Sequence, residues 1–357
     1  AVLIGQRLEN YFLPKPAASF SDAGKEEHLS KALFLLHGFL TCTDDWDVLI
    51  PYLRPYYDEI VTYKQPGHEP NGVRPHFADF NADASFSGIE EQIGRLSAFD
   101  RVDVMGHSMG CAGAAYACSL LGNVGRVVMY APAFRYPRPD ILIKRGAHLR
   151  RLERLQTDCA DKELLSKLAT RTSTVKESYS KSVDLFFGRL LPHWSLRNLM
   201  TFARIMKRGR EYLPSVRRPL CVFWGDLDEF IPFSSVRLVL KRTQSAEKYL
   251  VRYPDDGHAL IYLGNVPRLA RDTLIFLNGG SLTDAECEKG ESRMCCRIVK
   301  GAAAGYVTVT GVSCDVARTN ERVSVAVGRM TETYSDGGDS IIGRLDKSGA
   351  SESGKFI

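Results

Sequence analysis

Residues 101–115, RVDVMGHSMGCAGAA, place a serine between an apolar run and a series of small residues. The first five residues are typical of a buried strand, and the small residues from position 110 onward predict a helix. The turn between them, Gly106-His107-Ser108-Met109-Gly110, has the spacing G-x-S-x-G. A serine on so tight a strand-to-helix turn has a strained backbone, so glycines must flank it to avoid clashes. The turn exposes the hydroxyl at a helix N-terminus, which predicts that Ser108 is a nucleophile.

Strands and helices alternate on both sides of this turn. Helices of about 10–15 residues between the strands predict a mostly parallel, doubly wound α/β sheet with right-handed crossovers. Residues 1–132 and 216–280 are expected to form one such core. The expected strands are residues 32–36, 59–63, 101–105, 126–130, 220–224 and 248–252, and the expected helices are residues 44–53, 87–97, 109–121, 234–242 and 265–278.

Residues 133–215 interrupt this alternation because they show helical periodicity only, which predicts an inserted helical cap. The positive charge of the protein lies here: Arg135 to Arg218 hold 20 Lys and Arg against 8 Asp and Glu, a net charge of +12. The rest of the chain holds 27 basic and 34 acidic residues, a net charge of −7. Such an uneven distribution is typical of a separate structural unit or a contact surface.

Residues 281–357 form a C-terminal extension of undetermined structure. Strands are expected at 306–312 and 323–327, and the Gly-, Ser- and Asp-rich end is expected to be disordered. Because the alternation of strands and helices closes with the helix at 265–278, we expect truncation after Gly280 to leave activity largely intact.

The serine hydroxyl needs a base, and His258 is the histidine at a suitable position. In this architecture the chain order is Ser, then Asp or Glu, then His, and His258 directly follows an expected strand near the end of the core. The acid should follow the strand 220–224, where Gly225-Asp226-Leu227-Asp228-Glu229 offers three carboxylates. Asp228 fits the spacing G-x-x-D-x-x-x-P and is preferred, with Asp226 as the alternative.

The chain resembles the α/β-hydrolase family, and in particular its esterase and monoacylglycerol-lipase-like members that carry a helical cap. The resemblance covers about residues 30–280, and the matching residues are His37-Gly38-Phe39, Pro66-Gly67-His68, Gly106–Gly110, Asp228 and His258. It implies that the backbone amides of Phe39 and Met109 form an oxyanion hole. Glu69 departs from the common Pro-Gly-His-Gly pattern, and nothing in 281–357 belongs to the family pattern.

The expected reaction is hydrolysis of a carboxylic ester through an acyl-enzyme. His258 would deprotonate Ser108, and Asp228 would stabilise the imidazolium. The serine argues against haloalkane dehalogenases and epoxide hydrolases, which resemble this fold but use aspartate at that position. An acyltransferase or thioesterase with the same triad, or a slow-turnover ligand receptor of the same fold, is the alternative. The sequence contains no phosphate-binding loop, dinucleotide fingerprint or metal-ligand spacing, so no cofactor and no metal are expected.

The apolar residues of the insert favour a lipid-like or medium-chain acyl group as the substrate, although most of them are expected to form the core of the cap. The charge of the insert predicts either peripheral contact with an anionic membrane surface or a solvated basic face. Nucleic-acid binding is excluded because aromatic residues are not interleaved with this charge. The residues expected around the substrate are His37, Gly38, Leu40, His107, Phe186, Phe187 and Trp194.

Composition and targeting signals give the broad class. With 44% hydrophobic and 25% charged residues, the chain has the balance of a soluble globular protein. The nine cysteines include no CxxC pair, which favours reduced thiols and a cytoplasmic location. The N-terminal residues 1–5 lack the features of a secretory signal, but a start at Ala leaves secretion with a removed signal as the alternative. The oligomeric state is not indicated.

Overall fold

The structure is a computed structural model of the 357-residue chain. It describes residues 29–70, 73, 75–138, 140–185, 187–188, 193, 195–282, 293–300, 307–319, 322–334 and 342–345. Among these described residues, no helix is both long enough and apolar enough to cross a membrane.

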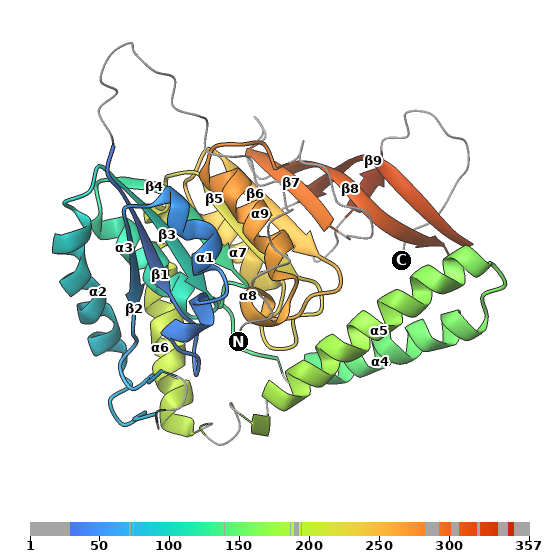
Figure 1. Ribbon diagram of the computed structural model, residues 1–357, viewed down its shortest axis with the longest axis horizontal. Helices are drawn as coiled ribbons and strands as arrows, with labels where there is room; N and C mark the ends of the chain where they lie inside the picture. The colour runs from blue at the N-terminus through green and yellow to red at the C-terminus, as the bar shows by residue number, and fades with distance from the viewer. Residues whose placement is uncertain are drawn as a thin grey trace, which may run out of the picture.

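One ten-stranded sheet runs through the molecule in the order β10-β9-β8-β7-β6-β5-β4-β3-β1-β2 (Figure 1). The first six strands in the chain pair in parallel, and the last four continue the same sheet in antiparallel pairing. The parallel strands are β1 (Lys31–Leu36), β2 (Glu59–Tyr63), β3 (Arg101–His107), β4 (Val124–Tyr130), β5 (Leu220–Gly225) and β6 (Lys248–Tyr253). The antiparallel strands are β7 (Arg293–Lys300), β8 (Val307–Thr319), β9 (Arg322–Tyr334) and β10 (Ile342–Leu345).

Helices cover both faces of the parallel strands, which is why these strands are continuous apolar runs. β5 is buried along its whole length, and β3 along all but its first residue. One face is covered by α1 (Ile50–Leu53), α8 (Leu260–Leu263) and α9 (Val266–Leu277), and the other by α2 (Ala82–Leu96), α3 (Gly110–Leu120) and α7 (Ser234–Arg242) (Figure 1). The predicted mostly parallel, doubly wound α/β fold is confirmed.

Two helices differ from the prediction at their ends, for local reasons. The expected helix at 44–53 is divided into the 3₁₀ turn η1 (Thr43–Trp46), α1 and the 3₁₀ turn η2 (Arg54–Tyr56). Pro55 has no amide hydrogen, so α1 cannot extend through it as a regular helix. The helix expected to begin at 87 begins at Ala82, because the Asn81 side chain accepts a hydrogen bond from the Ala84 amide at 2.8 Å.

The insert between β4 and β5 divides into two parts. α4 (Asp140–Thr157) and α5 (Lys162–Leu185) form an antiparallel hairpin that projects from the sheet (Figure 1). α6 (Leu196–Tyr212) instead packs along α3 in the body. Gly209 of α6 lies so close to Ala112 of α3 that a Cβ atom on Gly209 would overlap the Ala112 methyl group. The small residues of α3 therefore let part of the insert pack closely against the core.

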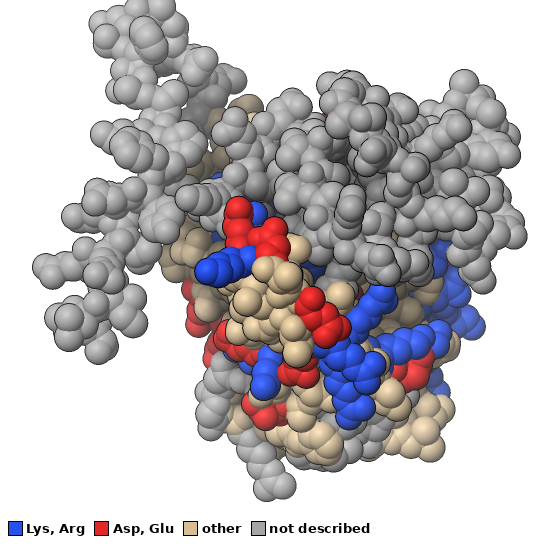
Figure 2. Space-filling model, turned by 90° about the vertical axis from the view of Figure 1, so that its right-hand side faces the viewer, with Lys and Arg blue, Asp and Glu red and all other residues tan. Residues whose placement is uncertain are grey.

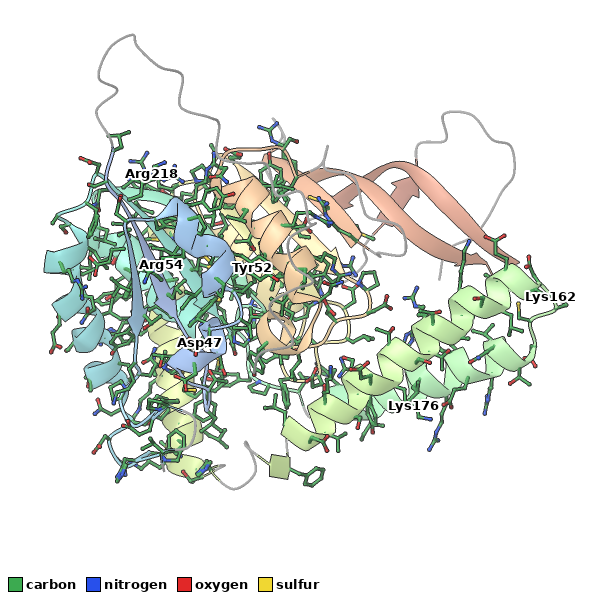
Figure 3. All side chains as sticks on the ribbon, in the orientation of Figure 1. Asp47, Tyr52, Arg54, Lys162, Lys176 and Arg218 are labelled. Atoms are coloured by element: carbon green, nitrogen blue, oxygen red, sulfur yellow. The ribbon has the colours of Figure 1, made fainter. Side chains whose placement is uncertain are left out.

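Charges of both signs lie along the hairpin of α4 and α5. Residues 140–185 hold 10 Lys and Arg and 7 Asp and Glu, so most of the net charge of the insert lies elsewhere. Figure 2 looks onto the side of the molecule with the hairpin and shows basic and acidic side chains intermixed. Figure 3 places Lys162 at the far tip and Lys176 farther along α5. Pairs four residues apart on these helices are Lys144–Asp140, Lys167–Glu163 and Lys181–Glu177.

The C-terminal extension is joined to the core by β7, a strand that the sequence analysis missed. β7 pairs with β6 from Lys248–Ile298 to Arg252–Met294. Its first residue, Arg293, is buried and lies 3.3 Å from a carboxylate oxygen of Asp272 in α9, which also accepts a hydrogen bond from the hydroxyl of Tyr253. The expectation that truncation after Gly280 is harmless is therefore not supported, because truncation would expose the edge of β6 and leave Asp272 without Arg293.

The two strands expected in the extension are present but longer, as β8 and β9. Each was predicted only over its most apolar part, whereas the pairing of β8 with β9 extends the ladder from Val307–Tyr334 to Thr319–Arg322. The Gly-, Ser- and Asp-rich end after residue 327 was expected to be disordered, but residues 328–334 belong to β9 and 342–345 form β10; the rest of this end lies outside the described residues.

Candidate active site

Ser108 lies on a strained turn between β3 and α3. Its φ angle is +52°, in the left-handed region that side chains other than glycine seldom adopt. A Cβ atom on Gly106 would lie 2.7 Å from the carbonyl oxygen of Gly110, and one on Gly110 would overlap the carbonyl oxygen of Leu36. Both glycines are therefore required by close backbone packing, which is the reason the G-x-S-x-G spacing predicted this turn.

Parallel pairing brings the predicted site residues to one edge of the sheet. The loop with Gly38 follows β1, Ser108 follows β3, Asp228 follows β5 and His258 follows β6. β1 lies between β2 and β3 in the sheet. The connection after β1 leads to β2 on one side, whereas the connection after β3 leads to β4 on the other side, so the loops after β1 and β3 diverge. Crevices at such switch points are the usual ligand sites of open α/β sheets.

Ser108, His258 and Asp228 form a hydrogen-bonded series. Nε2 of His258 lies 2.9 Å from Oγ of Ser108, and Nδ1 of His258 lies 2.7 Å from Oδ2 of Asp228. The other carboxylate oxygen of Asp228 accepts hydrogen bonds from the amides of Phe230 and Ile231 at 2.9 and 2.8 Å. Because Asp228 accepts the hydrogen on Nδ1, Nε2 is left to accept the hydroxyl hydrogen of Ser108. This arrangement can take a proton from the serine.

The structure separates the two candidate acids. Asp226 lies 2.8 Å from Nε of Arg252 and is partly exposed, away from His258. Asp228 is buried beside the imidazole. Burial alone lowers the pKa of His258, but the charge and hydrogen bond of Asp228 together with the charge of Glu229 outweigh it, so the pKa is raised. The surroundings therefore stabilise the imidazolium.

The amides of Phe39 and Met109 both lie beside Ser108. A Cβ atom on Gly38 would lie 3.2 Å from Cβ of Ser108, so the loop before Phe39 is in contact with the serine. Met109 precedes the first residue of α3, where the helix dipole favours negative charge. Neither amide donates a hydrogen bond to another residue in the part of the chain that the structure describes. Both amides therefore remain candidates for an oxyanion hole.

Some residues expected around the substrate instead support the loops. His37 donates a hydrogen bond from Nδ1 to the carbonyl oxygen of Gly38 at 2.9 Å and accepts one at Nε2 from the amide of Gln65 at 3.0 Å. Burial, with a smaller contribution from His68, lowers the pKa of His37 to about 3, so this ring is neutral. Leu40 is buried at a φ angle of +58°. Neither His37, Gly38 nor Leu40 lines the cavity beside Ser108.

His107, in contrast, lines that cavity and also supports the backbone of His258. Its Nε2 donates a hydrogen bond to the carbonyl oxygen of His258 at 3.1 Å. Burial and the neighbouring His258 lower the pKa of His107 to about 3. Of the aromatic residues predicted in the insert, Phe187 is 61% exposed and does not line the cavity, whereas Phe186 and Trp194 lie outside the described residues.

The cavity beside Ser108 and His258 has a volume of about 50 Å³ and is almost entirely apolar. Phe39 and Phe202, which both line it, stack on each other, with ring centroids 4.9 Å apart and planes inclined by 7°. Phe230 and Tyr262 were missed by the sequence analysis, and the signal that could have found them is their nearness in the chain to Asp228 and His258. The apolar lining residues include Phe39, Leu185, Leu199, Phe202, Phe230 and Tyr262.

A family model described as "Alpha/beta hydrolase family" matches residues 33–270. The chain belongs to the α/β-hydrolase family. A solved structure reported with the metagenome-derived lipolytic enzymes LipS and LipT shares 15% identity with this α/β hydrolase, covers 70% of this chain and 94% of its own, and gives a TM-score of 0.50. A soluble variant of monoglyceride lipase from Saccharomyces cerevisiae also shares 15% identity, covers 72% and 89%, and gives 0.50. At such identities these likenesses show the fold alone. Comparison of this α/β hydrolase with curated proteins finds no significant match.

Proposed function

We propose that this α/β hydrolase is a serine esterase that cleaves carboxylic esters with an apolar acyl group. The observation that carries the proposal is the hydrogen-bonded series from Asp228 through His258 to Ser108, with distances of 2.7 and 2.9 Å. Two backbone amides beside the serine hydroxyl add to it. A nucleophile, an oriented base and oxyanion donors at one point are what acyl transfer requires.

Each group has a role in the proposed reaction. His258 takes the proton of Ser108 as Oγ attacks the ester carbonyl, and the amides of Phe39 and Met109 stabilise the oxyanion that forms. His258 then gives the proton to the leaving alcohol, so that an acyl-enzyme remains. Water, deprotonated by His258, attacks this acyl group, and the acid is released as Ser108 regains its proton. Asp228 holds the imidazole and stabilises its positive charge.

The apolar cavity supports an acyl group without charge. The aromatic and aliphatic lining can bury an alkyl chain, at about 0.8 kcal/mol for each buried CH₂. A cavity of about 50 Å³ holds only the first few carbons, so a medium-length or longer chain requires the side chains over the cavity to move. Two structural neighbours bear the names of lipolytic enzymes, which agrees with this choice.

A fluorophosphonate probe and a series of p-nitrophenyl esters of increasing chain length test the proposal. The wild-type protein should react with the probe and turn over esters repeatedly, and Ser108→Ala should do neither. Ser119→Ala is a matched control, because Ser119 lies on the same helix and bonds only to the carbonyl oxygen of Tyr116 among the described residues. Labelling of Ser108→Ala at the wild-type rate would contradict the nucleophile.

The same assay separates the alternative functions. Repeated hydrolysis distinguishes an esterase from a receptor, which would release a single equivalent of product and keep the adduct. Glycerol and thiol acceptors added to the reaction distinguish an acyltransferase, since transfer would then exceed hydrolysis. Faster turnover of acyl thioesters than of the matching oxygen esters would favour a thioesterase.

A further inference from the structure

Glu229, the residue after Asp228, is a second carboxylate that holds His258. It is 1% exposed, and its Oε2 accepts a hydrogen bond from the backbone amide of His258 at 3.1 Å. Asp228 bonds to the ring of the same histidine. Two adjacent acids after β5 therefore hold both the main chain and the imidazole of His258.

Arg145 reaches Glu229 from the hairpin. This arginine of α4 is 3% exposed, and its Nη1 lies 3.2 Å from Oε2 of Glu229. The same nitrogen donates hydrogen bonds to Oγ of Ser182 and to the carbonyl oxygen of Ser178, both in α5. One buried guanidinium thus connects both helices of the hairpin to the loop that carries the base.

The backbone before His258 is shaped for this contact. A Cβ atom on Gly257 would lie 2.9 Å from Nη2 of Arg145 and 2.9 Å from Oε2 of Glu229. A side chain at position 257 would therefore require the guanidinium or the carboxylate to shift. The ion pair therefore lies directly against the backbone at Gly257 and His258.

A buried ion pair of this kind is not explained by stability alone. Removing two charges from water is costly, and well-packed apolar side chains of similar size are often as stable or more stable. Burial raises the pKa of the Glu229 carboxyl, and the positive charge of Arg145 opposes that rise. Ionised Glu229 adds to Asp228 in favouring the imidazolium of His258. The pair therefore acts on the electrostatics of the base.

We propose that Glu229 is a positioning residue for the base: it holds His258 in line with Ser108, and Arg145 of the hairpin holds Glu229 in place. This inference rests on the proposed function, because the position of His258 affects turnover only if His258 is the base. Through Arg145, the hairpin of α4 and α5 then helps to position His258.

Glu229→Gln tests the proposal directly, with p-nitrophenyl butyrate as the substrate. We expect kcat to fall about 10-fold while KM stays within about two-fold, because the effect is on the base and not on substrate binding. The acid limb of kcat/KM should move to lower pH, since the lost negative charge had raised the pKa of His258. The nearest other ionisable groups, Asp228, His107 and Arg145, are unchanged in this variant, as are the charged residues that line the neighbouring cavity with Glu229, which include Lys181, Asp255, Asp256 and Arg268.

Arg145→Met should lower kcat as well, and Lys144→Met is its matched control. Lys144 is the preceding residue of α4, carries the same charge and pairs with Asp140 at the surface. The control should keep the wild-type kcat, KM and pH profile. Loss of kcat in Lys144→Met equal to that in Arg145→Met would overturn the assignment to the buried pair.

The double variant Glu229→Gln/Arg145→Met separates positioning from stability. Each single variant leaves one buried charge without its partner and is expected to unfold at a lower temperature, whereas the double variant removes both charges. We expect the double variant to recover most of the unfolding temperature but to keep the lowered kcat and the shifted acid limb. A folded double variant with the wild-type kcat and pH profile would show that the pair is only structural.

A titration of His258 by NMR reads the same coupling without a substrate. Glu229→Gln should lower the pKa of the His258 imidazole, and Lys144→Met should not. If the wild-type protein hydrolysed no ester while Glu229→Gln still lowered this pKa, the proposed function would fail and the link from Glu229 to His258 would stand. An unchanged His258 titration in Glu229→Gln would overturn the inference.

Discussion

The parallel and antiparallel halves of the sheet differ in what they support. The carboxyl ends of β1, β3, β5 and β6 all point to one edge, and the residues of the candidate site follow them. β7 to β10 alternate in direction, so successive turns lie at opposite edges, and no proposed site residue lies in their described part. β7 instead contributes Arg293, which pairs with Asp272 inside the core. Parallel pairing brings the loops of the candidate site together at one edge, whereas the added strands cover the edge of β6.

The largest expected effect concerns the parallel edge. Asp228→Asn should lower kcat about 10,000-fold, because the amide cannot hold the imidazole in the tautomer that accepts the serine proton. Asp226→Asn is the control and should lower kcat less than about three-fold, since Asp226 pairs with Arg252. Steady-state kinetics check both. The reverse order would assign the acid to Asp226 and break the link between the strand ends and the site.

The second effect concerns the antiparallel half, where stability rather than turnover should change. Arg293→Met should lower the free energy of unfolding by about 2 kcal/mol, because it removes the more deeply buried of the two arginines beside the Asp272 carboxylate, the other being Arg271. The folded fraction should keep kcat within about two-fold. Denaturant unfolding and active-site titration measure the two quantities.

Arg297→Met provides the control in the same strand, because Arg297 is exposed. Its effect should stay below about 0.5 kcal/mol. If Arg293→Met instead reduced kcat strongly without a change in stability, the separation of the two halves would be wrong.

The smallest expected effect, on kcat/KM, distinguishes an aromatic side chain that lines the cavity at the carboxyl edge of the parallel strands from one that does not. Phe202→Ala should lower kcat/KM for short-chain esters about 10-fold, because Phe202 lines the cavity and stacks on Phe39. Phe187→Ala should stay within about two-fold, since its side chain is 61% exposed. Equal losses in both variants would mean that the substrate extends over Phe187.

Features that depend on a few adjacent residues were predictable from the sequence. The turn at Ser108 is one, because its strain is relieved by glycines at fixed neighbouring positions. The alternation of strands and helices predicted the parallel core for a similar reason, since burial on both faces leaves long apolar runs. Asp228 was preferred over Asp226 from its spacing to Pro232, and the structure places Asp228, not Asp226, beside His258.

Features that join distant parts of the chain were not predictable. β7 has charged residues at both ends and is a strand because β6 offers it an unpaired edge. Nothing near Arg145 in the sequence distinguishes it from the other basic residues of the insert, yet among the described residues it is the one that pairs with Glu229.

The chemistry of this protein is therefore largely a matter of local sequence, because a strained turn, a strand end and a loop spacing each need only neighbouring residues. The residues that hold the candidate site in place are instead determined by tertiary packing. Which arginine is buried, which aromatic rings close the cavity and which strand covers β6 follow from the free energy of burying distant groups together, and that is settled only when the whole chain has folded.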